Sequence, residues 1–230
     1  MRSDVGCVTT HQFNDEAKHW LLADIGNTRI HLYDGKEVVH LLPDEAIEQY
    51  GTQKVYYISV NHHLEPRLKR ETAWENISDQ VHIPCEYDTM GVDRRALCLS
   101  HDNGVFVDAG SAITVDVMER GIYKGGFIYP GLKALQESYA RISPALETGL
   151  DTDISLTELP RTTKGQISYG IIAPIKTLIE TLSRGKPLYV TGGDGRTVSG
   201  FFANAVYDET LVFKGMVHAL RTSEEVGSRK

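Results

Sequence analysis

Two acidic strand ends in this sequence have the residue types that suit binding of a phosphate and its metal ion. An apolar run leads into Asp24, and Gly26 and Thr28 then form a small polar turn before alternation resumes over residues 29–33. This pattern predicts two strands joined by a tight turn. Backbone N–H groups in the turn, with the Thr28 hydroxyl, can line a concavity for anions. An ordinary hairpin fits the same residues, because Gly-Asn turns commonly join strands.

The same pattern returns 84 residues later. Residues 104–107 form an apolar run into Asp108, which is followed by Gly110, Ser111 and a second alternating strand. This spacing is too long for a solenoid repeat and fits two copies of one hairpin unit in two related domains. Two such turns facing each other across a cleft would direct both sets of backbone amides at one polyphosphate. A third carboxylate, Asp93, lies at a predicted helix start, where it either caps the helix or points into the cleft.

Three converging carboxylates would by themselves repel a phosphate. The arrangement makes chemical sense with cations between them, typically Mg²⁺ at the phosphates. The sequence contains no G-x-x-x-x-G-K-[ST] segment, and no G-x-G-x-x-G segment that follows a strand and opens a helix. A glycine-rich loop over residues 192–195 is either a plain turn or a place where the backbone approaches a flat ligand.

Hydrophobic periodicity predicts the elements that must position these residues. We expect each half to open with three meander strands, and the clearest helix is 168–183, in which Pro174 either causes a bend or marks a later start. Residues 143–164 have no strong period. The remaining predicted strands are 36–42, 55–60, 81–83, 123–129, 187–191 and 211–213, and the remaining helices are 44–49, 61–74, 132–142, 196–204 and 215–222.

Length, charge and cysteine content limit the class of protein. A chain of 230 residues predicts one large or two small domains. The net charge of −7 and the lack of a long basic run argue against nucleic-acid and anionic-membrane partners. Cys7, Cys85 and Cys98 form no C-x-x-C pair, so we expect reduced thiols in the cytoplasm rather than a disulfide framework or a zinc site. No apolar run is long enough for a signal peptide or a membrane span, and residues 1–19 resemble a polar extension.

Five segments, in one order, resemble a known family. The segments are 24–28, 91–94, 108–112, 125–131 and 191–193. In set and order they resemble type III pantothenate kinases, which belong to the acetate and sugar kinase, Hsp70 and actin superfamily. The resemblance implies an α/β fold of two ribonuclease-H-like (actin-like ATPase) domains, at 20–103 and 104–230, with mixed sheets flanked by helices and a nucleotide in the interdomain cleft. It further implies a cytoplasmic homodimer that uses ATP to phosphorylate pantothenate to 4'-phosphopantothenate, the first step of coenzyme A biosynthesis.

The resemblance also implies a role for individual residues. Asp93 matches the general base, Asp24 lies near Mg²⁺ that is held through the phosphates, and Asp108 matches the ligand of a monovalent cation, K⁺ or NH₄⁺. Ser111 stands where the family usually has Thr, but the hydroxyl is kept. The implied ATP-binding residues are Asp24, Ile25, Gly26, Asn27, Thr28, Arg29, Ile30, His31, Ser111, Gly192 and Gly193. The implied pantothenate-binding residues are Tyr87, Gly91, Val92, Asp93, Arg94 and Thr163.

Three other functions fit parts of the pattern. A kinase for another small hydroxy or carboxylate substrate is disfavoured by the compact size and by residues 91–94. A non-enzymatic nucleotide-binding regulator is possible because fold does not fix function, but it would have no need for Asp93 beside both phosphate loops. A structural protein with neutral hairpins would leave the repeated Asp-x-Gly pattern unexplained.

Overall fold

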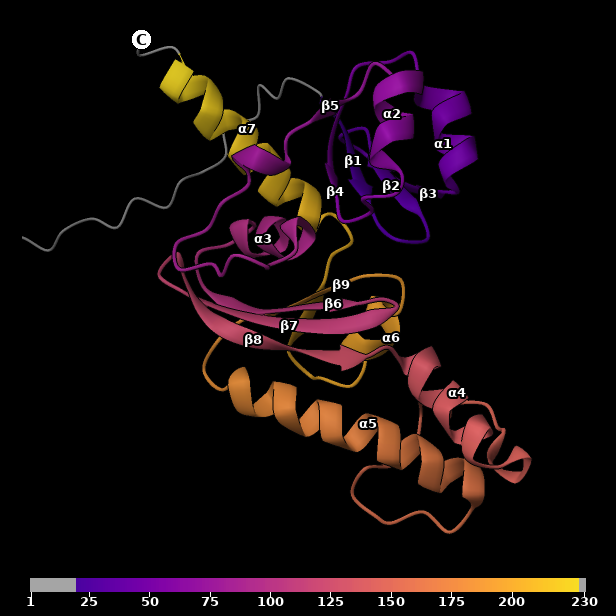
Figure 1. The fold of residues 1–230 in the computed structure, drawn as a ribbon. Coiled ribbons are helices and arrows are strands. Elements are labelled where there is room, and N and C mark those ends of the chain that lie inside the picture. The colour runs from indigo at the N-terminus through magenta and orange to yellow at the C-terminus, as the bar shows by residue number, and fades with distance from the viewer. Residues whose placement is uncertain (1–19, 228–230) are drawn as a thin grey trace, which may run out of the picture.

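The computed structural model describes residues 20–227 and contains two five-stranded sheets with the same topology (Figure 1). In each sheet, three antiparallel strands form a meander, and two further strands add in parallel beside its first strand. The first sheet has the order β3-β2-β1-β4-β5 and the second the order β8-β7-β6-β9-β10. The repeat inferred from the two Asp-x-Gly segments is therefore a repeat of the whole unit, and the predicted α/β fold with mixed sheets is confirmed.

The strands of the first sheet are β1 (Leu21–Ile25), β2 (Ile30–Tyr33), β3 (Val38–Leu41), β4 (Val55–Ser59) and β5 (Glu75–Asn76). Those of the second are β6 (Gly104–Ala109), β7 (Ala112–Glu119), β8 (Ile122–Pro130), β9 (Leu188–Thr191) and β10 (Ala205–Tyr207). The helices are α1 (Pro43–Tyr50), α2 (Glu65–Glu71), α3 (Val92–Leu99), α4 (Leu132–Ile142), α5 (Thr163–Leu182), α6 (Gly195–Ser199) and α7 (Leu211–Gly227).

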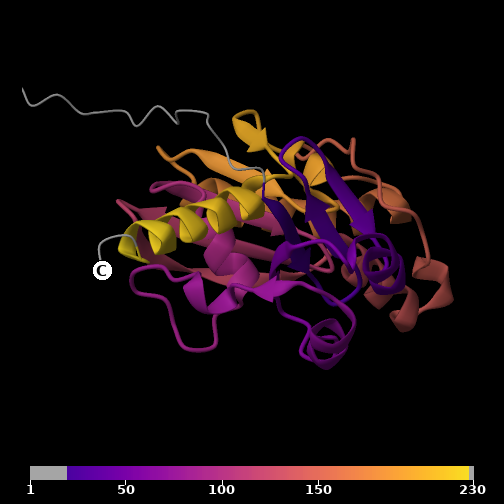
Figure 2. The same ribbon diagram turned by 90° about the horizontal axis from the view of Figure 1, so that it is seen from above.

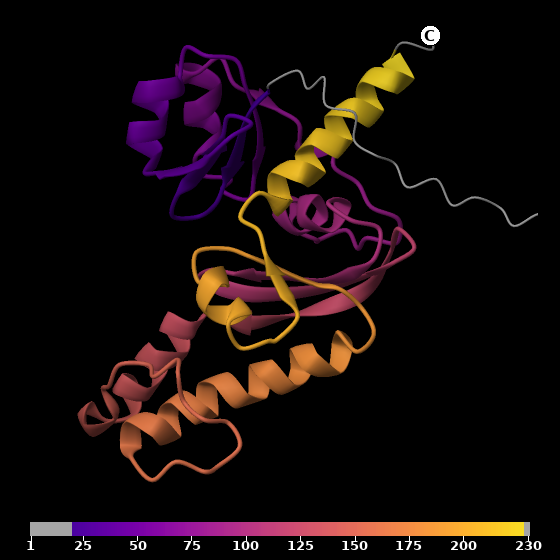
Figure 3. The same ribbon diagram turned by 180° about the vertical axis from the view of Figure 1, so that it is seen from behind.

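Helices and sheets alternate in layers. Helices α1 and α2 pack against the outer face of the first sheet through Ala46 and Leu68. Helix α5 packs against the outer face of the second sheet through Ile171 and Ile175, and Figure 3 shows it below that sheet. Helices α3 and α7 lie between the two sheets (Figure 1). Each half therefore contributes one helix to a shared middle layer.

The middle layer carries the core that joins the halves. One cluster of buried side chains includes Leu22 of β1, Phe106 of β6 and Met216 of α7. Helices α3 and α7 cross closely, as Figure 2 shows from above. A Cβ atom at Gly215 would collide with the carbonyl oxygen of Ala96, so the crossing requires glycine. Burial of this apolar surface is the main force that holds the two sheets together.

Several predicted elements differ in the structure. Residues 211–213 begin α7 and are not a strand, because a helix enclosed between two sheets is apolar on every side at its start. Residues 81–83 alternate in burial but pair with no strand, whereas β5 is fully exposed and gave no apolar signal. Helices α2 and α6 are shorter than predicted. Helix α5 starts earlier, at the Thr162 cap, and continues through Pro174.

The predicted extension over residues 1–19, with Cys7, lies outside the described residues. Within residues 20–227, none of the helices combines the length and the apolar character that crossing a bilayer would need.

Candidate active site

Asp24 and Asp108 occupy equivalent positions at the ends of β1 and β6. In the register of each hairpin, Asp24 lies opposite His31 and Asp108 lies opposite Thr114. Burial raises the pKa of Asp24 well above its usual range, and the charges of Asp93 and Asp108 raise it further. Burial, then the charges of Asp93 and Asp116, raise the pKa of Asp108 to about 7. The charges of these carboxylates, which come from β1, β6 and α3, therefore act on one another in the folded protein.

Asp93 stands in the first turn of α3, whose N-cap is Gly91. Its Oδ1 accepts a hydrogen bond of 2.8 Å from the backbone N–H of Arg94. A Cβ atom on Gly91 would collide with that oxygen, so the glycine makes room for the carboxylate. Burial raises the pKa of Asp93, and the Arg94 N–H opposes this rise. Asp93 therefore satisfies a backbone N–H at the helix start, as one of the two alternatives expected from the sequence, and its role in a cleft stays a prediction.

The first predicted phosphate loop is a closed, exposed turn. The Gly26 N–H donates to the carbonyl of Arg29 over 3.0 Å. The Asn61 side chain donates to the carbonyls of Gly26 and Asn27 over 3.4 and 3.5 Å. This leaves the Asn27, Thr28 and Arg29 side chains exposed. Preorganised backbone amides beside a carboxylate suit a metal-bound phosphate.

Three other residues predicted for ATP binding lie beneath that turn. Ile25 and Ile30 are fully buried in the core, so only their backbone can face a ligand. His31 is half-buried, and its Nδ1 lies 2.5 Å from Nδ1 of His40 on β3. Burial, then the charges of His40 and Arg29, lower the pKa of His31 to about 4. His31 is therefore neutral at physiological pH.

The second predicted phosphate loop lies against Asp108. Ser111 is exposed in the turn between β6 and β7. Gly192, which follows β9, has φ +93° and packs so closely on the Asp108 carboxylate that any Cβ would collide with it. A left-handed residue in such close contact must be glycine. The Asp194 N–H then donates to the carbonyl of Ala109 over 2.8 Å, which holds the glycine loop on the end of β6.

A buried ion pair ties α3 to the second sheet. Arg94 Nε donates to Asp116 Oδ2 over 3.0 Å, and its Nη2 donates to Oδ1 over 2.6 Å. Tyr123 also donates to Asp116 Oδ1 over 3.0 Å. Arg94 Nη1 donates to the Tyr87 hydroxyl over 2.5 Å, which places Tyr87 beside the 91–94 segment. Asp116 has no exposed surface, and Arg94 is 6% exposed.

Sequence reasoning missed Asp116 and Thr114. Both lie on β7, on the face shared with Asp108, and the Thr114 hydroxyl is buried with no partner among the described residues. A signal was present in the sequence. In a strand whose other positions are buried and apolar, polar residues at alternate positions form a polar strip on one face.

Thr163, which was predicted to bind the substrate, lies far from Asp93 within this chain. It is the exposed first residue of α5. That helix packs against Val105 and Val107, on the face of the second sheet opposite α3. Figure 1 shows the start of α5 beside α4, well away from α3.

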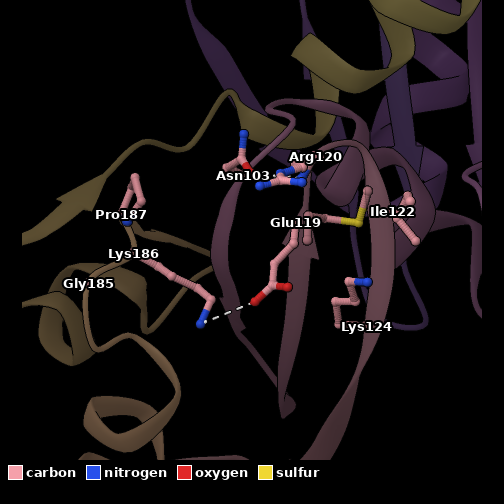
Figure 4. A pocket seen from close by; sticks show the side chains of 9 residues that line it. Asn103, Glu119, Arg120, Ile122, Lys124, Gly185, Lys186 and Pro187 are labelled. Carbon is pink, nitrogen blue, oxygen red and sulfur yellow. Dashed lines mark hydrogen bonds and ion pairs between the residues drawn. The ribbon is translucent and has the colours of Figure 1, made fainter.

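A pocket of about 670 Å³ lies at the opposite end of the second sheet (Figure 4). Its rim carries Arg120, Lys124 and Lys186, and Lys186 forms an ion pair of 3.4 Å with Glu119. The pocket is lined by the start of β8 and the end of β7, whereas Asp108 and Gly192 lie at the other ends of β6 and β9. None of the predicted site residues lines it.

The carboxylates fit a hard cation that arrives with its ligand. Within residues 20–227, no three His, Cys, Asp or Glu side chains form a group that could hold a metal ion alone. Mg²⁺ usually binds through one or two carboxylates together with substrate phosphates and water. Asp24 and Asp108 offer oxygen donors of that kind at the two phosphate loops, and the unpartnered Thr114 hydroxyl adds another oxygen nearby.

The two repeated mixed sheets with their flanking helices form an α/β fold of two ribonuclease-H-like (actin-like ATPase) units. A solved Sinorhizobium meliloti protein described as a 2-dehydro-3-deoxygalactonokinase shares the fold, with a TM-score of 0.56 at 12% identity over 88% of this chain and 98% of its own. Residues 57–184 match the family model for type III pantothenate kinase. The chain belongs to the type III pantothenate kinase family.

Named relatives cover nearly the same length. A type III pantothenate kinase of Helicobacter hepaticus is 42% identical over 201 residues, which are 87% of this chain and 98% of the relative. One of Campylobacter jejuni is 39% identical over 196 residues, 85% of this chain and 94% of the relative. A solved Campylobacter jejuni protein, described as a conserved Baf family transcriptional activator, has a TM-score of 0.81 at 38% identity and covers 89% of this chain and 99% of its own.

Proposed function

We propose that the protein transfers the γ-phosphoryl group of ATP to the primary hydroxyl of pantothenate, giving ADP and 4'-phosphopantothenate at the start of coenzyme A biosynthesis. One observation supports the proposal beyond family membership: Asp24 and Asp108 occupy equivalent strand ends of the two sheets, and Gly91 and Gly192 leave room for the carboxylates of Asp93 and Asp108. Phosphoryl transfer requires mainly positioning and charge neutralisation. Two amide-lined turns with a carboxylate at each supply both.

Asp93 is the proposed general base. The pantothenate hydroxyl oxygen bonds to the γ-phosphorus, the bond to the β–γ bridging oxygen breaks toward ADP, and the hydroxyl proton passes to Asp93. Burial raises the pKa of Asp93, which brings this carboxylate closer to the operating pH, where general bases are effective. The Arg94 N–H keeps the Asp93 carboxylate oriented at the helix start.

Asp24 would hold Mg²⁺ through the phosphates, and Asp108 would hold K⁺ or NH₄⁺. These cations, when bound, neutralise the charge between the carboxylates and the polyphosphate. We place ATP between residues 24–31 and the loops at Ser111 and Gly192–Gly193. Pantothenate lies against Gly91, Val92, Arg94 and Tyr87. We assign residues 20–103 and 104–230 to the two domains.

We further propose a cytoplasmic homodimer. Thr163 is exposed on the far side of the second sheet from Asp93. A contact between Thr163 and pantothenate would therefore come from a second copy of the chain.

A coupled assay of ADP release tests the proposal. With ATP, pantothenate and Mg²⁺, we expect turnover that needs K⁺ or NH₄⁺ and that stops when both are replaced by tetramethylammonium. Mass spectrometry should find product heavier than pantothenate by one phosphoryl group. Protein that hydrolyses or binds ATP but modifies no pantothenate, with both cations present, would refute the proposed activity.

A nucleotide-binding regulator is the second candidate, since one similar solved protein is described as a transcriptional activator. The net charge of −7 opposes DNA binding, which relies on basic surface. Retention of labelled promoter DNA fragments at low salt, with no kinase turnover, would favour the regulator. Turnover without retention would favour the kinase.

A further inference from the structure

The two halves differ at one pair of equivalent positions in the helix layer. Asp116 lies opposite Phe106 in the second hairpin, and Tyr33 lies opposite Leu22 in the first. Each of these two β-strand residues contacts the third residue of a helix from the other half. Asp116 binds Arg94 of α3, whereas Tyr33 stacks on Phe213 of α7 with ring centroids 5.2 Å apart.

The apolar contact shows that the architecture does not need an ion pair there. Phe213 is 2% exposed, so its contact with Tyr33 is part of the buried core. A buried ion pair is no better for stability than an apolar pair of similar size, because removing two charges from water is costly. The Arg94–Asp116 pair therefore calls for a reason other than stability, and it lies beside Asp93.

The geometry of Arg94 supplies that reason. Its Nε and Nη2 are both occupied by Asp116, in the two-pronged arrangement that fixes a guanidinium plane. Nη2 also donates to the Tyr123 hydroxyl over 3.4 Å, and Nη1 donates to the Tyr87 hydroxyl. An arginine can only donate hydrogen bonds. The Tyr87 oxygen must therefore accept from Arg94, and the Tyr87 O–H is left to donate to something else.

That remaining donor is available to a ligand. Tyr87 is 41% exposed, and its ring lies over Tyr123 with centroids 6.2 Å apart. Gly126 on β8 completes the arrangement, because any larger residue would intrude on the Asp116 carboxylate. The chain of contacts thus runs from a carboxylate with no exposed surface, through the residue that follows Asp93, to an exposed phenol.

We propose that Asp116 is a positioning residue, which through Arg94 fixes Tyr87 as a hydrogen-bond donor to an acceptor group of the bound hydroxy substrate. Asp116 itself touches no substrate. It also holds the first turn of α3, which carries the catalytic residue Asp93. The inference rests on the proposed function for the identity of the substrate, which is pantothenate.

Steady-state kinetics of Asp116→Asn test the proposal. Asparagine keeps the size of the side chain but offers Arg94 one oxygen instead of two. We expect the KM for pantothenate to rise about tenfold or more, with the KM for ATP within twofold of the wild type. Phe213→Leu is the matched control, since it weakens the equivalent contact in the other half. It should lower the melting temperature and leave both KM values unchanged.

Two further variants keep the proposal falsifiable. If Asp116→Asn does not fold, Tyr123→Phe removes one hydrogen bond to Asp116 and should raise the pantothenate KM about threefold. In the double variant Asp116→Asn/Tyr87→Phe, the pantothenate KM should rise no more than about twice as much as in the more damaging single variant. The reason is that both changes act through the same hydrogen-bond donor, the Tyr87 hydroxyl. An unchanged pantothenate KM in the folded variants, or fully multiplicative losses, would overturn the positioning role.

Titration calorimetry with pantothenate and a non-hydrolysable ATP analogue tests the positioning role of Asp116 separately from the proposed kinase activity. Wild-type protein that binds pantothenate without phosphorylating it would refute the proposed activity only, and weaker binding by Asp116→Asn would still support the positioning role. Equal binding by wild type and Asp116→Asn would refute that role whether or not turnover occurs.

Discussion

The two halves share one topology, yet only one of their middle-layer helices has charged residues in its first three positions. Helix α3 begins with Val92, Asp93 and Arg94, and its counterpart α7 begins with Leu211, Val212 and Phe213. All three α7 residues are buried and apolar. The comparison separates what the fold requires from what the chemistry requires. An apolar helix start suffices to join the sheets, so the two charges of α3 point to function.

The largest expected effect is the loss of kcat on replacing Asp93, the charged residue at the second position of α3. Asp93→Asn should keep the fold and lower kcat by about 10²- to 10⁴-fold, the usual size of general-base effects. Its counterpart variant Val212→Ala should cost about 1–3 kcal/mol of stability, through lost apolar burial, and leave kcat unchanged. Kinetics and circular dichroism on both variants measure this. A normal kcat in Asp93→Asn would assign Asp93 to the helix start alone.

The second effect tests whether the ion pair is dispensable for folding. Asp116→Leu alone leaves Arg94 charged and buried and should cost about 3–5 kcal/mol. The double variant Asp116→Leu/Arg94→Leu copies the apolar chemistry of the other half and should be at least as stable as wild type, but should not phosphorylate pantothenate. Denaturant unfolding gives both values. A double variant less stable than the single one would make the pair structural.

The third effect concerns the stability of the crossing between α3 and α7. Gly215→Ala places a methyl group on the Ala96 carbonyl and should cost about 1–3 kcal/mol, as overpacked cores do. Gly149→Ala is a suitable control, because a Cβ there meets nothing within 4 Å. Thermal unfolding of the two variants provides the comparison. Equal melting temperatures would mean that α3 and α7 can separate at little cost.

The smallest effect concerns pH. Asp108 has a pKa of about 7 in the folded protein, against an ordinary value of 3.8. A raised pKa means that the folded state binds the proton more tightly, so this group's contribution to stability is present below pH 4 and is lost as the pH rises through 7. Asp108→Asn cannot ionise. Without ATP, Mg²⁺ or K⁺, it should be more stable than wild type at pH 8 by on the order of 2 kcal/mol, since water partly screens this half-buried group.

The melting temperatures of wild type and Asp108→Asn, measured between pH 4 and pH 8, check this prediction. The two curves should nearly coincide at pH 4, separate progressively between pH 4 and pH 7 with the variant more stable, and stay a constant distance apart above pH 7. Curves that stay parallel across the range would show that Asp108 is not under electrostatic strain.

The fold was predictable because the same Asp-x-Gly pattern ends the first strand of each half. The spacing between Asp24 and Asp108 predicted paired hairpins, and the ordered motifs predicted the family, which the comparisons confirm. The helix layer was not predictable from local pattern. Residues 211–213 have the apolar character of a strand because two sheets enclose them, and that enclosure depends on contacts with residues far away in sequence.

The site was predictable only in part, for a similar reason. Motifs identified Asp24, Asp93 and Asp108 as candidate site residues, and burial raises the pKa of each of them. Asp116 lies 22 residues beyond Arg94, and nothing local relates the two. The residue roles, the cation sites, the domain limits and the Thr163 contact stay predictions.

The shared core has a consequence for the order in which the chain folds. The cluster that buries Leu22 of the first sheet is completed by Met216 and Leu220 of α7, nearly two hundred residues later. The first half is synthesised first, but the inner face of its sheet stays open to solvent until α7 leaves the ribosome. Exposed apolar surface and unpaired strand edges favour aggregation during that interval. Slower translation or chaperone capture during that interval is therefore expected to change the yield of this protein.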